Sequence, residues 1–410
     1  MEQGNEADNI ETICWGYAMD RRKFIRLAGG GVVLAATTSH LTGCSLSSAY
    51  PAEAIEIWHG PQENADPRRW ALAYAITAPN PHNLQPWIAD LREPNVITIR
   101  TDPTRVLPNT DPFGRQILIG HGAFLELLVI ALAQKGFSAE VALWPEGELS
   151  TQLQQWDQRP IARISLQANG TKDPLFSQIL QRHTPKTDFD TSKPVNAAAL
   201  QQLLKTTETT PGIRAGGTVD AEKLSPYREL CWQAAQVELL TPRTVMESIH
   251  LTRVGPAEIL QHRDGISLNS LPIRIMNTLG LFDRKNSPEK DSQAYKAMMS
   301  RYLGFSQSAM GFIWLSGTNH RTDQIQAGRA YVRMQLRATE LGIGVHPLSQ
   351  ALQEFPEMQA HYATAHQITL NRAAPKSTED ETVHMFCRLG YTLKPASATP
   401  RRPLEKFIKV

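Results

Sequence analysis

The sequence of 410 residues predicts an α+β fold. Segments with helical and with strand periodicity are mixed along the chain, without the strict strand–helix–strand alternation that builds a parallel sheet. The chain also has no Gly-x-Gly-x-x-Gly loop, which argues against a doubly wound dinucleotide-binding domain. The second half repeats the order of elements of the first half loosely.

In the first half, alternating β-branched residues predict a strand and a long apolar periodicity predicts a helix. Gly136 stands where a left-handed cap would end that helix. The segment 45–66 has few periodic apolar residues and contains Pro51, Gly60 and Pro61, as is typical of a tether. The expected elements are a helix at 70–76, a strand at 96–100, a long helix over 117–132, and strands at 139–144 and 161–166.

In the second half, Pro194 is placed where a first helical turn tolerates proline. Tyr331, Met334, Ala338 and Leu341 fall on one face of a helix. The expected elements are helices at 194–204 and 323–341 and strands at 311–316 and 383–389. Residues 241–310 form a polar, helix-rich insertion with no counterpart in the first half. We expect that insertion to be a lid or an interaction arm.

The N-terminal region has the pattern of a twin-arginine export signal. Arg21 and Arg22 precede an apolar run over residues 27–38 that is too short to span a bilayer. The run ends in Leu-Thr-Gly-Cys, similar to a lipoprotein cleavage site, so Cys44 is expected to carry a lipid. The sequence therefore predicts an extension over 1–18, a signal peptide over 19–43 and a tether over 44–66. The alternative is a basic amphipathic N-terminus that contains Arg-Arg by coincidence.

Export of this kind places the folded protein in the periplasm or elsewhere outside the cytoplasm, anchored to the membrane, with the twin-arginine translocase as a partner. Such systems carry folded cargo, usually because a cofactor is inserted first. Cys231 and Cys387 lack metal-ligand spacing, so no metal is expected. The charge is balanced, with 42 basic and 40 acidic residues, and gives no support to nucleic-acid binding.

Three further segments have distinctive sequences. They are Ala-Pro-Asn-Pro-His-Asn-Leu-Gln-Pro-Trp at 78–87, Arg-His-Thr-Pro-Lys-Thr-Asp-Phe-Asp at 182–190, and a closing stretch at 388–405 that contains Pro-Arg-Arg-Pro-Leu-Glu. These segments resemble the nitroreductase superfamily of FMN flavoproteins, especially its Acg-like branch. Shorter pieces at 110–115, 327–330 and 341–350 fit the same branch. The resemblance is spread over most of residues 68–410 and implies FMN as the cofactor.

The resemblance implies roles for particular residues. A flavin phosphate is a dianion that needs cations and hydroxyl donors in place of water. Its ligands are expected among Arg182, Thr184, Lys186 and one of Arg401 and Arg402, with His183 as an adjacent contact. Taken alone, the string at 182–186 could equally be a solvated helix start.

The loop at 79–83 is short and polar, which suits contact with the edge of the isoalloxazine ring. Its expected contacts are Pro79, Asn80, Asn83 and Gln85, although a plain surface turn is the alternative. In the family this loop comes from the opposite subunit of a homodimer. Its place in the first half therefore implies two fused nitroreductase-like halves, 67–170 and 171–410, that form a pseudo-dimer within one chain.

The two halves are not equivalent in sequence. Where the second half should repeat the loop it has only Thr-Thr-Pro-Gly-Ile at 209–213, and the first half has Asp-Pro-Arg-Arg-Trp at 66–70 in place of a phosphate segment. One flavin site per chain is expected, in a monomeric pseudo-dimer or a homo-oligomer of it.

Ser349 and Gln350 stand where many reductases of the family have Glu-Gly, and a backbone N–H there normally meets flavin N5. The change puts the orientation of a nicotinamide donor in question. His82, His121 and His346 are not at metal-ligand spacing and are expected to be hydrogen-bonded structural histidines.

The expected function is that of an FMN-dependent oxidoreductase that passes electrons to a nitroaromatic, a quinone or a similar small acceptor in ping-pong fashion. Flavin N5 would be the reactive atom, with no obligatory catalytic side chain. Because soluble NAD(P)H is not expected outside the cytoplasmic membrane, a membrane quinol or a redox protein is the expected donor. The alternatives are a protein that stores flavin under a lid without turnover and a scaffold that has lost flavin.

Overall fold

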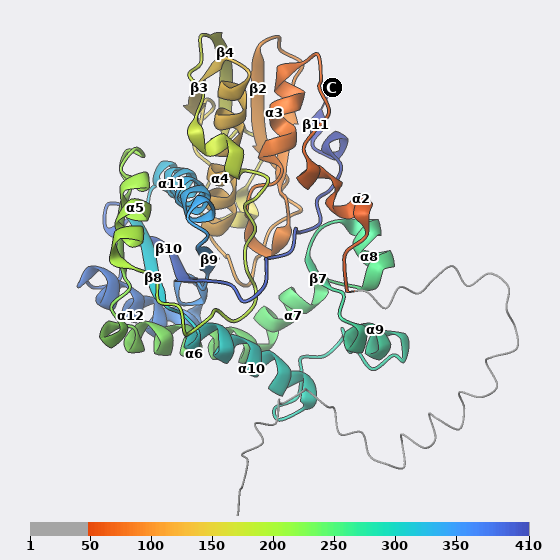
Figure 1. Ribbon diagram of the computed structural model, residues 1–410, viewed down its shortest axis with the longest axis vertical. Helices are drawn as coiled ribbons and strands as arrows, with labels where there is room; N and C mark the ends of the chain where they lie inside the picture. Colours follow the sequence, from red (N-terminus) through yellow and green to blue (C-terminus); the bar gives the residue numbers. More distant parts are fainter. Residues whose placement is uncertain (1–47, 410) are drawn as a thin grey trace, which may run out of the picture. The chain divides into compact units, whose positions relative to one another are not determined.

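Two sheets, each with a long helix packed on it, form the framework of the protein (Figure 1). The structure is a computed structural model that describes residues 48–409. The twin-arginine pattern at Arg21 and Arg22 and the predicted lipidation site at Cys44 lie outside the described residues.

The first sheet has five strands in the order β11-β1-β2-β4-β3. All its pairs are antiparallel except β1 with β11. Its strands are β1 (Trp87–Asp90), β2 (Val96–Thr101), β3 (Phe137–Leu143), β4 (Ala162–Ala168) and β11 (Ile408–Lys409). The helices α3 (Pro67–Ala75) and α4 (Arg115–Gln134) share its core. The predicted strands and helices of the first half are therefore confirmed.

The second sheet is antiparallel, in the order β5-β8-β10-β9. Its strands are β5 (Arg214–Thr218), β8 (Gly311–Thr318), β9 (Gly344–Pro347) and β10 (Glu381–Gly390). Ile313 and Cys387 pack with α5 (Ala197–Thr207) and α11 (Arg321–Glu340). Their neighbours Phe312 and Phe386 face α6 (Ser225–Leu240) and α12 (Gln359–Leu370).

The helix expected at 194–204 starts three residues later than predicted. The side chain of Asn196 accepts a hydrogen bond from the amide of Ala199 at 2.7 Å and caps α5. Pro194 thus lies outside the helix and not in its first turn. The cap residue decides where the helix begins.

The two long helices cross at a pair of glycines. Gly122 is the eighth residue of α4 and Gly328 the eighth of α11, and both helices have 20 residues. A Cβ atom on Gly122 would lie 1.9 Å from the carbonyl oxygen of Ile325, and one on Gly328 would lie 1.9 Å from that of Ile119. This reciprocal contact relates the two halves as the two subunits of a symmetric dimer are related.

Helix α4 is a core helix of this assembly. It is long and apolar enough to cross a membrane, but 83% of its most apolar window is buried inside the protein. Its apolar residues instead hold the first core together, which residues of α11, among them Ile325, Val332 and Leu336, also enter.

The C-terminal segment crosses from the second half to the first. After β10 the chain runs back to the first sheet, where β11 pairs in parallel with β1 and Ile408 lies opposite Ala89 (Figure 1). On the way, the amide of Arg401 donates a hydrogen bond to the carbonyl of Ala54. The sequence patterns did not predict this strand, which has only two residues.

Part of the predicted tether packs onto the folded body. Residues 52–59 form α2 (Ala52–Ile55) and a 3-10 helix, η1 (Glu56–His59). Ala54 and Trp58 are buried, and the indole N–H of Trp58 donates to the carbonyl of Thr399 at 2.8 Å. The apolar area of these two side chains explains why the segment is not extended.

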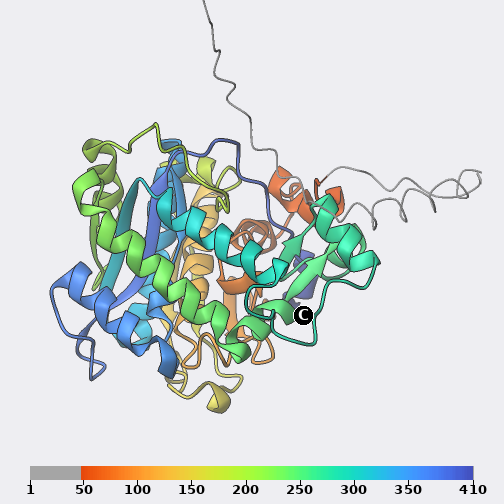
Figure 2. The ribbon, with the colours of Figure 1, turned by 90° about the horizontal axis from the view of Figure 1, so that it is seen from below.

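The insertion at 241–310 forms a group of short elements beside the first half (Figure 2). They are α7 (Pro242–His250), β6 (Thr252–Val254), α8 (Gly255–His262), β7 (Ile266–Leu268), α9 (Leu271–Thr278) and α10 (Gln293–Gln307). Asp264 forms ion pairs with Arg105 of the first half and with Arg253 of the insertion itself. The insertion thus belongs in sequence to the second half but packs on both halves, since α10 also packs on α6.

His121 departs from the expectation of a hydrogen-bonded histidine. It is fully buried in α4, packs edge-on against Trp87, and neither ring nitrogen has a hydrogen-bond partner among the described residues. Burial lowers the pKa of its ring to about 3, so it is neutral.

Replacing His121 with leucine is expected to raise the free energy of unfolding by about 1 kcal/mol, because it removes a buried polar group that has lost its water. Urea unfolding at pH 7 measures the change. Leu118→His, on the same helix, is the matched control and should destabilise. A loss of stability in His121→Leu would mean that the ring has a partner in solution.

Candidate functional site

The loop between α3 and β1 has an unusual backbone. It contains the 3-10 helix η2 (Pro81–Asn83), and His82, Asn83 and Gln85 have φ values of 48°, 54° and 53°. Residues other than glycine rarely adopt this left-handed region, and asparagine and histidine adopt it more often than most other residues. Such strain persists only where surrounding contacts impose it, and it is concentrated at functional sites.

Contacts within the loop and from the insertion hold it in this conformation. The side-chain oxygen of Asn80 accepts from the amide of Gln85 at 2.8 Å. The Gln85 side chain donates to the carbonyl of Arg263 at 2.9 Å, and the amide of Gly265 donates to the carbonyl of Asn83 at 3.3 Å. His82 Nε2 lies 2.8 Å from the hydroxyl of Ser248 on α7. The insertion therefore covers the loop, as a lid would.

Arg401 anchors the same loop from the C-terminal segment. Its buried guanidinium donates to the carbonyl oxygens of Ile76, Thr77 and Ala78 at 2.8–3.1 Å. It also donates to the side-chain oxygen of Asn83 at 2.6 Å. Burial and the positive charge of Arg182 lower the pKa of Arg401 to about 9.

Arg182 and His183 lie beside Arg401. Arg182 donates to the carbonyl of Thr77 at 2.8 Å and to the side chain of Gln335 at 3.1 Å, while its Nε has no partner among the described residues. The ring of Trp58 contacts all three, with the guanidinium carbons of Arg182 and Arg401 5.6 Å and 5.3 Å from its centroid and the His183 ring at 4.6 Å. Nδ1 of His183 is buried without a partner in the described chain.

Lys186 and Arg301 complete a group that we call the cation cluster: Arg182, His183, Lys186, Arg301 and Arg401. Lys186 is an exposed residue, but protein atoms lie close around its ammonium group. The partial loss of water around this group and the positive charges of Arg301 and Arg401 lower its pKa to about 8. Within residues 48–409, no ion pair joins the arginines or the lysine of the cluster to a carboxylate.

The charges of the cluster reach two histidines of the site. Burial and the positive charge of Lys186 lower the pKa of His82 to about 4. Burial, Arg388, Lys186 and Arg301 hold the pKa of His346 well below its usual value. Excess positive charge therefore extends from the strained loop to β9. An anion placed there would relieve the repulsion.

The remaining predicted residues lie either near the cation cluster or at the end of β9. Thr184 lies in the cluster region, where its hydroxyl accepts from Gln335 at 3.3 Å. Only the backbone amide of Arg402 contacts the loop, at Gln85, whereas its guanidinium lies over the ring of Phe407. The structure thus selects Arg401 over Arg402 as the inward-facing cation.

Ser349 and Gln350 lie beyond His346, at the end of β9. The Ser349 hydroxyl exchanges two hydrogen bonds with the backbone of Phe386, donating at 3.0 Å and accepting at 3.2 Å. The side-chain oxygen of Gln350 is buried without a partner in the described chain. No hydrogen bond within residues 48–409 joins these two side chains to Arg182 or Arg401.

Two residues of the candidate site were not predicted from the sequence. Trp58 lay in the segment expected to be a tether, and a tryptophan in such a segment is the signal that could have marked it. Arg301 lies on α10 of the insertion, without any motif around it. Only the fold places its positive charge near Lys186.

One carboxylate of the insertion makes a concentrated contact with the first half. Glu247 on α7 accepts four hydrogen bonds at 2.6–3.1 Å, from the backbone and side chains of Asn109 and Thr110. Hydrogen bonds to a charged group are stronger than neutral ones.

Glu247→Ala is expected to cost about 2 kcal/mol of unfolding free energy and to speed amide hydrogen exchange in α7 and in the loop at 79–85, because the lid loses this attachment. Glu289→Ala, an exposed carboxylate of the same insertion, is the control and should change neither. Equal exchange in both variants would show that the attachment lies elsewhere.

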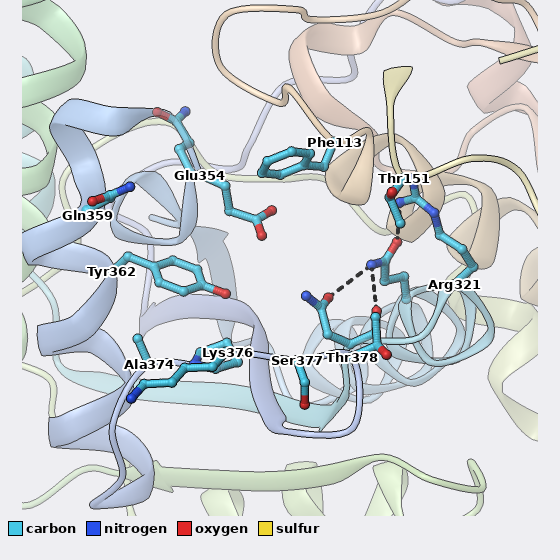
Figure 3. Close-up of a pocket in the computed structure, with 14 residues that line it drawn as sticks. Phe113, Thr151, Arg321, Glu354, Gln359, Tyr362, Ala374, Lys376, Ser377 and Thr378 are labelled. Carbon is cyan, nitrogen blue, oxygen red and sulfur yellow. Dashed lines mark hydrogen bonds between the residues drawn. The ribbon is translucent and has the colours of Figure 1, made fainter. Parts of the chain in front are cut away.

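A separate hollow of about 570 Å³ opens near the start of α11 (Figure 3). Phe113, Arg321, Glu354 and Tyr362 are among its lining residues, and none of the predicted site residues lines it. Its carboxylate, Glu354, is paired with Arg115 at 3.0 Å. Because neither the strained loop nor the predicted site residues line this hollow, we place the candidate site at the cation cluster.

Within the described residues, no group of three or more histidine, cysteine or acidic side chains could hold a metal ion. Cys231 and Cys387 are buried and unbridged. Burial raises the pKa of both thiols, so neither is a reactive thiolate.

Fold and site together define a protein of two interlocked α+β halves, with a cation cluster and a strained loop beneath a lid. The chain is 25% identical over 344 residues to "Putative NAD(P)H nitroreductase acg" of Mycobacterium tuberculosis, an alignment that covers 83% of this chain and 94% of that protein. A second nitroreductase-named protein of that species is 35% identical over 83 residues, 20% of this chain and 24% of the relative.

The solved structures that match the chain are less similar to it in sequence. The FMN- and NADPH-dependent nitroreductase NfnB of a Sphigopyxis species matches with a TM-score of 0.33 and 15% identity, covering 58% of this chain and 99% of that one. A Bacteroides fragilis nitroreductase with bound FMN matches with a TM-score of 0.31 and 15% identity, covering 57% and 95%. No protein-family model matches the chain.

The predicted fold class is confirmed. The reciprocal glycine contact and the similarity along 94% of the acg protein agree with two fused nitroreductase-like halves in one α+β chain.

Proposed function

We propose that the protein binds FMN and acts as a nitroreductase-like oxidoreductase. The cation cluster carries this proposal, because it gathers arginines and a lysine without a carboxylate beside a strained loop. A cluster of this kind is costly without an anion. The similarity to the acg protein over most of both chains supports the same conclusion.

The residues present fit FMN. Nε of Arg182 and Nδ1 of His183 are buried without a hydrogen-bond partner among the described residues, and with the ammonium of Lys186 they would hold the phosphate. Arg401 would act by positioning, since its donors already hold the loop. Backbone groups of that loop would lie along the ring edge. When bound, FMN supplies the redox chemistry, by accepting and releasing electrons at the flavin ring.

The proposal also includes an electron acceptor, a location and an electron donor. The acceptor would be a small nitroaromatic, quinone or similar molecule, reduced in a second step after the donor leaves. With Cys44 lipidated after twin-arginine export, the protein would lie at the outer face of the cytoplasmic membrane. A membrane quinol or a redox protein would then be its electron donor in place of NAD(P)H.

The visible spectrum of the purified full chain tests flavin binding. A yellow protein with absorbance near the usual flavin maxima is expected, and a colourless protein that takes up no added FMN would overturn the proposal. Stopped-flow mixing with a quinol and, separately, with NADPH then tests turnover. Fast bleaching by NADPH alone would contradict the proposed donor, and flavin that neither bleaches nor exchanges would indicate storage.

A further inference from the structure

An apolar stripe runs along α9 at the edge of the insertion. Leu271, Ile275 and Leu279 follow each other at intervals of four residues, so they lie on one face of the helix. Their exposed fractions are 38%, 48% and 57%, and Leu281 just beyond the helix is 64% exposed. No residue of α9 is buried. We call these four residues the α9 stripe.

The stripe lies next to the point where the described chain begins. The side-chain amide of Asn269, two residues before α9, donates to the carbonyl oxygens of Ser48 and Ala49 at 3.1 Å and 2.6 Å. Ser48 lies only four positions after Cys44, the predicted lipidation site. An extended segment of this length spans at most about 14 Å. A lipid on Cys44 therefore brings the bilayer within reach of the start of α9.

From this geometry we propose that the α9 stripe lies in the membrane interface, as a second contact beside the lipid. The proposal rests on the lipidation of Cys44 that the proposed function includes. It does not depend on flavin binding. An amphipathic helix of this kind lies parallel to the bilayer with its apolar face in the headgroup region.

The charges around the stripe favour apolar insertion over attraction to anionic lipids. Residues 271–291 contain four basic and three acidic side chains, which nearly cancel. Binding should therefore differ little between neutral and anionic vesicles and should be insensitive to salt. A helix held this way would set the lid, which contains α9, at the membrane surface.

Hydrogen exchange of the full chain, purified from membranes, tests the proposal. With phosphatidylcholine vesicles, amides of residues 271–281 should exchange at least about tenfold more slowly than in detergent-free buffer, and 0.5 M salt should not reverse this. Leu279→Asp combined with Leu281→Asp should abolish the protection. Leu393→Asp, another exposed leucine, at 68%, is the matched control and should keep it.

Unchanged exchange at 271–281 in vesicle-bound protein would overturn the proposal. Protection that rises with protein concentration and without vesicles would assign the stripe to a second copy of the chain instead. Amides of α4 serve as the check that each variant is folded. Because the readout is exchange and not absorbance, the outcome does not depend on whether FMN is bound.

Discussion

Gly122→Ala is expected to destabilise the protein by about 3 kcal/mol or more, enough to leave much of it unfolded or aggregated. The added methyl group would lie 1.9 Å from the Ile325 carbonyl oxygen and 2.9 Å from the Cα of Gly328. Both are backbone atoms of α11, so relief requires the two helices to separate along their contact. Thermal unfolding followed by circular dichroism measures the loss.

Gly120→Ala is the matched control on the same helix. There the new Cβ would meet the Cβ of Asn80 at 3.2 Å, a contact that a small shift relieves. Alanine also gains roughly 0.5–1 kcal/mol over glycine in a helix. We therefore expect a change within about 1 kcal/mol for Gly120→Ala. Similar losses in both variants would mean that the helix crossing is not the tight contact.

Lys186→Gln is expected to weaken FMN binding about 10- to 100-fold, the effect of removing one charged hydrogen-bond donor from a phosphate. The same change should stabilise the flavin-free protein, because it removes a cation that Arg301 and Arg401 repel. Titration of flavin fluorescence and urea unfolding measure the two effects. Their opposite signs separate a ligand-binding lysine from one that holds the fold.

The pH dependence follows from the same lysine. Its pKa in the folded, flavin-free protein is about 8, below the usual 10.5, so folding disfavours its charged form. The cost is present below pH 8 and disappears as the pH rises toward 10, so wild type should gain stability relative to Lys186→Gln over that range. Lys172 is an exposed lysine of the same half, so Lys172→Gln should change neither the free energy of unfolding nor the affinity for FMN. A loss of stability in Lys186→Gln would contradict the repulsion.

The sequence predicted most elements because their signals are local. The apolar periodicity from Ile117 to Leu132 matches α4, and the β-branched run at 96–100 matches β2. The structure also brings Arg182, His183 and Arg401 together with the loop at 79–85, although they are far apart in the chain. Their motifs indicated this grouping, whereas periodicity alone could not have done so.

What the sequence could not predict depends on contacts between distant segments. Two residues of β11 carry no strand signal, and they pair with β1 only because the chain crosses between halves. Arg401 and Arg402 are adjacent and chemically alike, so only the backbone direction decides which one faces the loop. Trp58 joins the site because Thr399 accepts its indole N–H, 341 positions along the chain.

The crossing of the C-terminal segment also affects when the protein can be completed during synthesis. The first sheet lacks its edge strand β11, and the loop at 79–85 lacks its clamp Arg401, until residues 401–409 have left the ribosome. A nascent chain therefore cannot assemble the candidate site, however early its first half is made. Any quality check that requires a finished site must act after this segment has been made, which suits a protein proposed to be exported only once it is folded.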